Sequence, residues 1–261
     1  MLQNIIRLVS GPRCPITQEQ KKWIEAQFAW MRQQFGPDPI RRPPLDPDSS
    51  LLPRKWDRSE KAGLHLFELL SQFMSVDPAR LQLDYYLKDE LGDVRSQLFG
   101  SYQHVGPAGL YFPQIDGEKL VIAVDKAQLE IPLSLCAVIC HELGHVLLLA
   151  DGRIEREAED CEPLTDLLTV YFGAGILSAN AAYQFYQWHS PSEQGWHTCR
   201  QGYLTEEVYG YALACYAWCR GETKPPWARY LKENIRCYFD DSRHYLAKTK
   251  DISLPFGADK L

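Results

Sequence analysis

The chain has 261 residues, of which 45% are hydrophobic and 24% charged, and its formal net charge is −6. This composition is that of an ordinary globular protein, with enough chain for one sizeable domain or two small ones. A modest acidic balance offers no basic surface to a phosphate backbone, so we expect no nucleic-acid partner. The first residues lack the apolar core of a signal peptide, and no later segment reaches the unbroken apolar length that spans a bilayer. We therefore expect a soluble, cytoplasmic protein without a membrane partner.

Eight cysteines raise the question of disulfides or a cysteine-rich metal site. Two pairs, Cys136 with Cys140 and Cys215 with Cys219, have helical spacing within apolar runs, where small buried thiols fit better than bridges. The sequence contains no CxxC pair, so we do not expect a cysteine-rich zinc finger.

The N-terminal part predicts one helix and a connector. Thr17 and Gln20 have capping-box spacing at the start of an amphipathic run, and Gly36 ends it before Pro37. Six prolines in the next stretch, up to residue 56, favour an extended connector. We divide the chain into 1–56, an N-terminal helix with this connector, and 57–261, the main domain, which together form one compact unit.

A second helix is expected from a capping box at Asp57 and Glu60 to about Met74. After this helix the sequence pattern changes to short apolar runs broken by glycine and proline, at 81–87, 96–105, 109–115 and 119–125. Residues 115–117 between the last two carry a hairpin-turn signal. These runs predict a small, mainly antiparallel sheet.

Helices dominate the remainder of the chain. Residues 132–150 form an apolar stretch that predicts one central helix, ended by Gly152. Further helices are expected at about 163–178, 179–188, 204–220 and 227–247, the last opening after Pro225-Pro226. The fold class is therefore α+β, predominantly helical, with the small sheet packed by the central helix.

The central helix contains the sequence HELGH at 141–145. Residues four apart lie on the same helix face, so the imidazoles of His141 and His145 can bind one ion. Glu142 lies beside that ion and can accept a proton from a water molecule that the metal activates. Ionisable side chains in so apolar a helix need partners, and one metal ion satisfies both imidazoles. The motif therefore predicts a zinc site.

A catalytic zinc normally has three protein ligands. HELGH at 141–145, followed by EPLTD at 162–166, resembles the gluzincin-type HExxH zinc metallopeptidases, and in its compactness the small members called minigluzincins. The resemblance covers about residues 118–175. It implies that Glu162 is the third zinc ligand, and that Asp166 hydrogen-bonds and orients a ligand histidine. Alternatives to Glu162 come from the acidic turn before it, namely Glu155, Glu157, Glu159 and Asp160, and from Cys161 as a thiolate ligand.

Zinc peptidases of this kind often add a donor that stabilises the oxyanion of the transition state. The candidates are Tyr209 and Tyr211, with His189, His197 and His244 as further possibilities. The resemblance also implies that an edge strand ahead of the active-site helix pairs with an extended substrate, and 119–125 holds that position.

These observations predict a zincin-like metallopeptidase that hydrolyses peptide bonds in a peptide or protein substrate. His141, His145 and Glu162 would bind Zn²⁺, and Glu142 would act as general base and then acid. Two alternatives stay open. One is a non-catalytic, zinc-stabilised module that binds a partner or senses a signal. The other is a regulatory protease with a single protein target.

Overall fold

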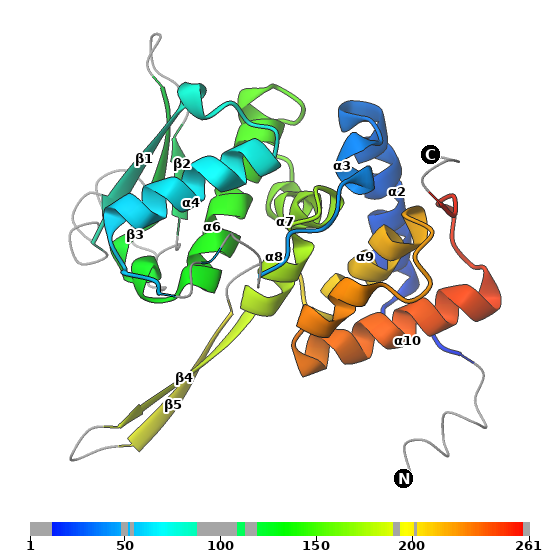
Figure 1. Cartoon of the computed structure of the whole chain (residues 1–261). Coiled ribbons are helices and arrows are strands. Elements are labelled where there is room, and N and C mark those ends of the chain that lie inside the picture. Colours follow the sequence, from blue (N-terminus) through cyan, green and yellow to red (C-terminus); the bar gives the residue numbers. More distant parts are fainter. Residues whose placement is uncertain are drawn as a thin grey trace. The chain divides into compact units, whose positions relative to one another are not determined.

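The computed structural model describes residues 12–47, 52, 55–87, 109–112, 119–189, 194–200 and 203–257, without the side chains of Phe112 and of the strands within 183–200. Helices predominate beside a small mixed sheet, which confirms the α+β class (Figure 1). The contacts divide the chain into two compact units, Pro47–Cys161 and Met1–Asp46 with Glu162–Leu261. We describe each unit separately.

In the unit Pro47–Cys161, helix α4 (Glu60–Phe73) is present as predicted, but a different residue caps it. The Oγ of Ser59 accepts a hydrogen bond of 3.1 Å from the backbone N–H of Ala62, so Ser59 is the N-cap. Asp57, the predicted cap, instead accepts hydrogen bonds from the backbone N–H and the hydroxyl of Ser59. These bonds lower the pKa of Asp57 and hold Ser59 in its capping position.

Three strands form the sheet of this unit: β1 (Leu81–Tyr86), β2 (Gly109–Phe112) and β3 (Leu120–Asp125). Their order is β1-β3-β2, with β2 antiparallel and β1 parallel to β3. The prediction of a mainly antiparallel sheet is therefore wrong. Strand direction depends on the path of the connecting chain, which the apolar pattern of each strand does not encode. The strand predicted at 96–105 and the turn at 115–117 lie outside the described residues.

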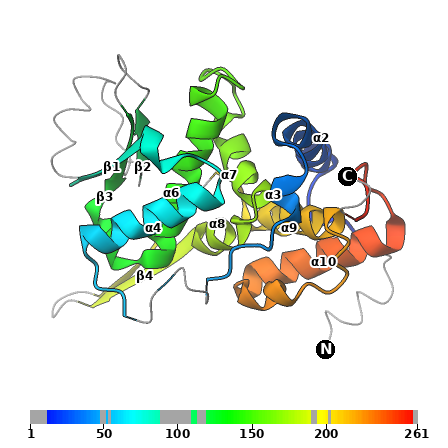
Figure 2. The ribbon, with the colours of Figure 1, turned by 45° about the horizontal axis from the view of Figure 1, so that its top comes forward.

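The central apolar helix is confirmed. Helix α6 (Pro132–His145) continues without a break into a π-helical segment, η3 (Val146–Ala150). Nearly all of α6 is buried, and it packs against α4, β2 and β3 (Figure 2). Gly152, with φ of +66°, follows the end of the helix as predicted, because a left-handed residue here costs least for glycine.

By length and composition, the stretch Pro132–Ala150 is also apolar enough to cross a membrane, although the sequence suggested that no segment was. Of its most apolar window, 78% is buried inside the structure, as in the core helix of a globular protein. Length and composition alone are therefore weak evidence for a membrane span.

The other unit consists of helices and one hairpin. Its elements are α2 (Gln18–Phe35), α3 (Asp38–Arg41), α7 (Cys161–Tyr171), α8 (Gly175–Ala181), β4 (Tyr183–His189), β5 (Gln194–Arg200), α9 (Glu206–Cys219), η4 (Pro226–Tyr230) and α10 (Glu233–Thr249). The capping box of α2 is present as predicted. Thr17 Oγ1 accepts from the N–H of Gln20 at 3.2 Å, and the Gln20 side chain accepts from the N–H of Thr17 at 3.0 Å. The proline-rich connector carries the short helix α3.

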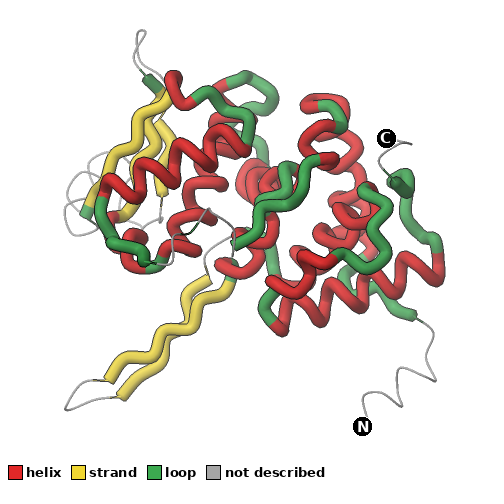
Figure 3. The backbone as a smooth tube through the Cα atoms, in the orientation of Figure 1, coloured by secondary structure: helices red, strands yellow, loops and turns green. Residues whose placement is uncertain are grey.

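Residues 163–188 differ from the prediction of two successive helices. Gly173, with φ of +86°, separates α7 from α8, because its left-handed backbone cannot continue a helix. The second predicted helix, 179–188, is mostly strand: β4 pairs antiparallel with β5, and Figure 3 shows the two as a long hairpin. Aromatic residues favour strands when a partner strand is available, and that partner follows later in the chain.

Helices α9 and α10 lie side by side and form much of the helical C-terminal region (Figures 1 and 2). α9 agrees with the prediction for 204–220. α10 begins later than predicted, because Pro225-Pro226 open the short 3-10 helix η4 and the α-helix starts only at Glu233. The core of this unit contains fully buried aromatic side chains, among them Phe28, Tyr171, Tyr216 and Phe239.

A buried ion pair within α2, Lys21 with Glu25, is the centre of a network of polar contacts. The network joins α2 to α9 and to the segment after α10. Lys21 Nζ lies 3.0 Å from Glu25 Oε1 and 3.2 Å from Asp251 Oδ1. Glu25 also accepts hydrogen bonds from the Tyr211 hydroxyl at 2.7 Å, and from the N–H and hydroxyl of Ser253 at 2.8 and 2.7 Å. Both Lys21 and Glu25 are buried, so these partners replace the water that each charge loses.

The two cysteine pairs with helical spacing behave as predicted. Cys136, Cys140, Cys215 and Cys219 are buried free thiols. Burial raises the pKa of Cys140 to about 12, so the thiol is neutral at physiological pH and serves as a small apolar side chain.

Candidate metal centre

The two histidines of HELGH lie on one face of α6, as the helical spacing predicts. Their ring centroids are 4.8 Å apart and the ring planes are nearly perpendicular, at 88°. His145 is buried and His141 is partly exposed. The rest of α6 is apolar and holds the helix in the core, so the backbone under both imidazoles is fixed by packing.

Glu162, in the first turn of α7, completes a group of three potential ligands. The ligand atoms of His141, His145 and Glu162 all lie within 4.8 Å of one another. Tetrahedral zinc bonds of roughly 2.0–2.2 Å place ligand atoms about 3.3–3.6 Å apart, so small side-chain rotations bring these atoms to one ion. Two imidazoles and a carboxylate are also a donor set that suits zinc. The group therefore fits the predicted metal.

Glu142 is 5% exposed and lies beneath strand β2. A Cβ atom added at Gly109 would come within 2.6 Å of Glu142 Oε1 and 2.7 Å of Val138 Cγ1. Only a glycine therefore allows the strand to approach the Glu142 carboxylate so closely. Sequence reasoning missed this residue, because a glycine at the start of an apolar run reads as a strand boundary.

Tyr111, two residues further along β2, is a second residue that sequence reasoning missed. Its ring is stacked on His145, with centroids 6.4 Å apart and an interplanar angle of 24°. The guanidinium of Arg156 lies over the same ring, 5.7 Å from its centroid. Burial raises the pKa of Tyr111, although Arg156 opposes the shift. The ring therefore limits the rotation of one candidate ligand.

Polar contacts fix the turn that follows α6 and η3. Arg153 Nη1 donates to the carbonyl oxygen of Leu147 at 2.6 Å and to Asp151 Oδ2 at 2.7 Å. Arg80 donates to the other oxygen of Asp151 at 2.9 Å. The two arginines lower the pKa of Asp151 against the effect of its burial. These contacts hold the turn at the end of η3 in place.

The alternative ligands that the sequence predicted lie in the acidic turn before Glu162. Glu155, Glu157 and Glu159 are exposed and Asp160 is half-buried. Neither these residues nor Cys161 belong to the three-ligand group found among the described residues. This arrangement favours Glu162 over its competitors.

Asp166 is 3% exposed and accepts two backbone hydrogen bonds. Its Oδ2 accepts from the N–H of Tyr203 at 2.6 Å and from that of Leu204 at 3.2 Å. The carboxylate therefore anchors the segment that leads into α9. Its predicted hydrogen bond to a ligand histidine stays a prediction.

The two tyrosines proposed as oxyanion donors are both buried in α9. Tyr209 is 1% exposed and Tyr211 is not exposed. The Tyr211 hydroxyl donates to Glu25, and its burial, reinforced by that carboxylate, raises its pKa far above 10. Tyr211 thus has a structural role in the buried ion-pair network. The catalytic role of either tyrosine stays a prediction.

Strand β3 does not occupy the edge position that the resemblance implied for 119–125. It is the central strand and pairs with β1 on one side and with β2 on the other. Within the described sheet, β2 is an edge strand, and it is also the strand that contacts Glu142 and His145. The strand beside the candidate centre is therefore β2.

The candidate centre thus combines three potential metal ligands, a buried glutamate and an adjacent strand. HELGH supplies His141 and His145 of the three-ligand group, and EPLTD supplies Glu162. Comparison with known proteins adds no relative: no protein-family model, no curated protein and no solved structure matches the chain.

Proposed function

We propose that this protein is a zinc-dependent metallopeptidase of the zincin type. The observation that carries the proposal is the convergence of His141, His145 and Glu162 within 4.8 Å of one another, with Glu142 next to the first ligand. A scaffold that merely binds zinc has no need of a buried carboxylate beside the ion. That carboxylate therefore favours catalysis over a non-catalytic zinc-stabilised module.

His141, His145 and Glu162 would hold Zn²⁺ and leave a fourth position open. When bound, the ion supplies Lewis acidity to a substrate carbonyl and lowers the pKa of a water molecule. Glu142 accepts the proton of the attacking water and returns it to the leaving amine. Its 5% exposure keeps competing water away from the carboxylate.

Strand β2 is the proposed binding site for the substrate backbone. An extended peptide can add to the edge of a sheet through main-chain hydrogen bonds. Gly109 and Tyr111 place β2 directly against the residues that carry the chemistry. A peptide paired with β2 would therefore have its backbone fixed next to Glu142. We propose a peptide or protein substrate on this basis.

The first experiment measures metal content by mass spectrometry on wild type, His145→Ala and Glu162→Ala. We expect about one zinc per wild-type chain and a large loss in both variants, because a three-ligand site does not survive removal of one ligand. Glu159→Ala is the matched control, since it removes an exposed carboxylate from the acidic turn and should keep its zinc. Wild type that cannot be loaded with zinc would overturn the proposal.

The second experiment tests catalysis with a fluorogenic peptide library. Glu142→Gln should retain zinc and lose peptidase activity by about 100-fold or more, because it removes the general base. A zinc-loaded wild type that cleaves neither the library nor any protein in a cell extract would identify the non-catalytic module instead. Cleavage of one protein with no activity on the library would identify the single-target regulatory protease.

A further inference from the structure

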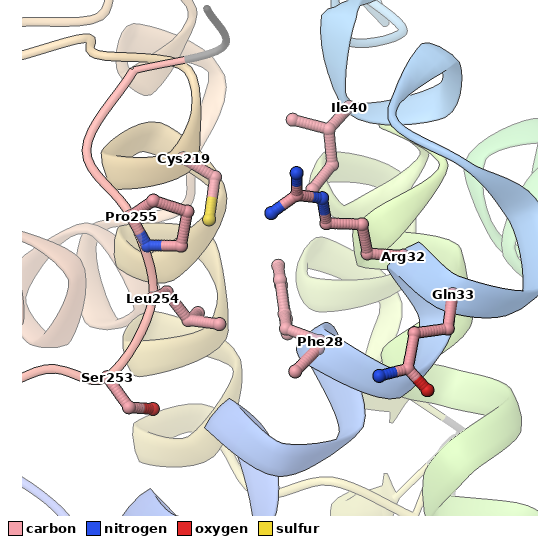
Figure 4. Close-up of a pocket in the computed structure, with 9 residues that line it drawn as sticks. Phe28, Arg32, Gln33, Ile40, Cys219, Ser253, Leu254 and Pro255 are labelled. Atoms are coloured by element: carbon pink, nitrogen blue, oxygen red, sulfur yellow. The ribbon is translucent and has the colours of Figure 1, made fainter. Parts of the chain in front are cut away.

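A second site is suggested by a cavity of about 430 Å³ in the unit Met1–Asp46 with Glu162–Leu261. Its lining comes from α2, α9, residue Ile40 of α3 and the segment after α10 (Figure 4). The volume lies in the range of small-molecule sites, roughly 300–1,000 Å³. None of its residues belongs to the candidate metal centre.

The walls of this cavity are mostly apolar. Phe28, Ile40, Leu254 and Pro255 provide hydrocarbon surface, and the thiol of Cys219 points into the space between them (Figure 4). Phe28 and Ile40 are core residues with exposures of 1% and 2%, so their positions are fixed by packing. The cavity is therefore a preformed surface for an apolar group.

Arg32 provides a positive charge in this apolar setting. It is half-buried, and its guanidinium points into the space between Ile40 and Cys219 (Figure 4). Within the described part of the chain, no carboxylate pairs with it and no hydrogen bond engages its guanidinium. Its place in the last turn of α2 suits a cation, but that does not require the side chain to face the cavity.

The charge of Arg32 acts on two ionisable side chains, Cys219 and Tyr171, and neither carries a negative charge that would balance it. Burial raises the pKa of Cys219 to about 12, although Arg32 opposes the shift, and burial also raises the pKa of Tyr171. Both groups are therefore neutral at physiological pH. Glu25, whose charge also reaches Cys219, is already paired with Lys21. Asp38, whose charge acts on Tyr171 together with that of Arg32, lies 3.8 Å from Arg41. Among the residues that line the cavity, Arg32 is thus the one charged side chain.

We propose that this cavity binds a small monocarboxylate with an aliphatic or aromatic body. Arg32 binds the carboxylate, because the planar guanidinium offers two parallel N–H donors to its two oxygens. Phe28, Ile40, Leu254 and Pro255 enclose the apolar body. A single guanidinium matches one negative charge, so a monoanion fits better than a phosphate dianion.

The test compares octanoate with 1-octanol, which has the same chain length but no charge, by titration calorimetry on the full chain. We expect octanoate to bind wild type about tenfold or more tightly than 1-octanol, the effect of charge-assisted hydrogen bonds in a partly buried site. In Arg32→Gln this preference should disappear, while 1-octanol binds as it does to wild type. Circular dichroism checks that the variant is folded.

Arg236→Gln is the matched control, because it removes the same charge from an exposed position on α10 in the same unit. It should keep the wild-type preference for octanoate. Equal binding of the two probes to wild type, or no binding of octanoate at millimolar concentration, would overturn the proposal. So would an octanoate preference that survives in Arg32→Gln, since binding would then occur elsewhere.

Discussion

Gly109 is the residue whose size most directly controls the proposed general base. Its substitution by alanine would place a methyl group within 2.6 Å of the Glu142 carboxylate and 2.7 Å of Val138. Either the strand or the carboxylate must move. We expect Gly109→Ala to lower kcat by about 10- to 100-fold with zinc content unchanged, because misplacement of a catalytic group by about 1 Å is that costly. Peptidase assays on zinc-loaded protein check this.

Gly63→Ala is a steric control for this experiment. A Cβ atom at position 63 would meet the Tyr85 hydroxyl, in the same unit but away from Glu142. Both substitutions should lower stability by about 1–3 kcal/mol, the usual cost of overpacking. Only Gly109→Ala should reduce kcat per zinc-loaded molecule. Unchanged kcat in that variant would mean that Gly109 does not position the base.

Glu25 is the residue on which the buried network of the other unit depends. It accepts hydrogen bonds from Tyr211 and Ser253 and pairs with Lys21. Glu25→Ala leaves Lys21 buried with only its more distant partner Asp251, so we expect a loss of about 3–5 kcal/mol in the free energy of unfolding. Urea titration measures it, and Ser253→Ala should cost only about 1 kcal/mol. Similar losses in both variants would contradict the central role of Glu25.

At the scale of elements, the end of the helix formed by α6 and η3 depends on Gly152. Its φ of +66° is strained for other residues, although a Cβ there would meet nothing within 4 Å. Gly152→Ala should therefore destabilise the protein by about 1 kcal/mol for conformational reasons alone. Gly152→Asn should cost less, because asparagine tolerates this region better. Thermal unfolding of the two variants compares them, and equal losses would point to a packing effect.

Elements with a strong local signal could be predicted from the sequence. The apolar run 132–150 determines α6 and η3, and the capping box at Thr17 determines the start of α2. Both signals act through contacts within a few residues. The parallel direction of β1 and the strand β4 could not be predicted. Both depend on pairing with segments distant in sequence, which intrinsic preferences do not encode.

The same distinction holds for the candidate site. His141, Glu142 and His145 follow from spacing on one helix, and Glu162 follows from the resemblance. Gly109 and Tyr111 come from a strand earlier in the chain and reach the site only through packing of β2 on α6. Their residue types carry no local signal for that role.

For the molecule as a whole, the ion pair predicts how stability depends on pH. Burial alone would raise the pKa of Glu25, but hydrogen bonds from Ser253, Tyr211 and Lys21 outweigh it and lower the pKa below 4.5. The carboxylate therefore stabilises the fold above about pH 4.5, and this contribution is lost as the pH falls through the folded-state pKa. The pKa of Lys21 is raised above 10.5, because its bonds to Glu25 and Asp251 outweigh the opposite effect of burial.

The lysine contribution is complete below about pH 10.5 and is lost as the pH rises through its folded-state pKa. Urea unfolding of wild type and Glu25→Gln between about pH 3 and pH 7 checks the acidic limb. We expect the difference in unfolding free energy to be constant near neutrality and to narrow below about pH 4.5. A difference that does not change with pH would show that the carboxylate charge contributes nothing.

The wide separation of these partners along the chain affects how the protein is made on the ribosome. Tyr211 and Ser253 follow Glu25 by 186 and 228 residues. At roughly 5–20 residues per second, Ser253 is added about 10–45 s after Glu25. In the last part of that interval, after residue 161 has been added, all of Pro47–Cys161 is synthesised while Glu25 on α2 still lacks Ser253. Translation that stops before Ser253 therefore releases a chain in which the buried Glu25 carboxylate lacks both hydrogen bonds from Ser253.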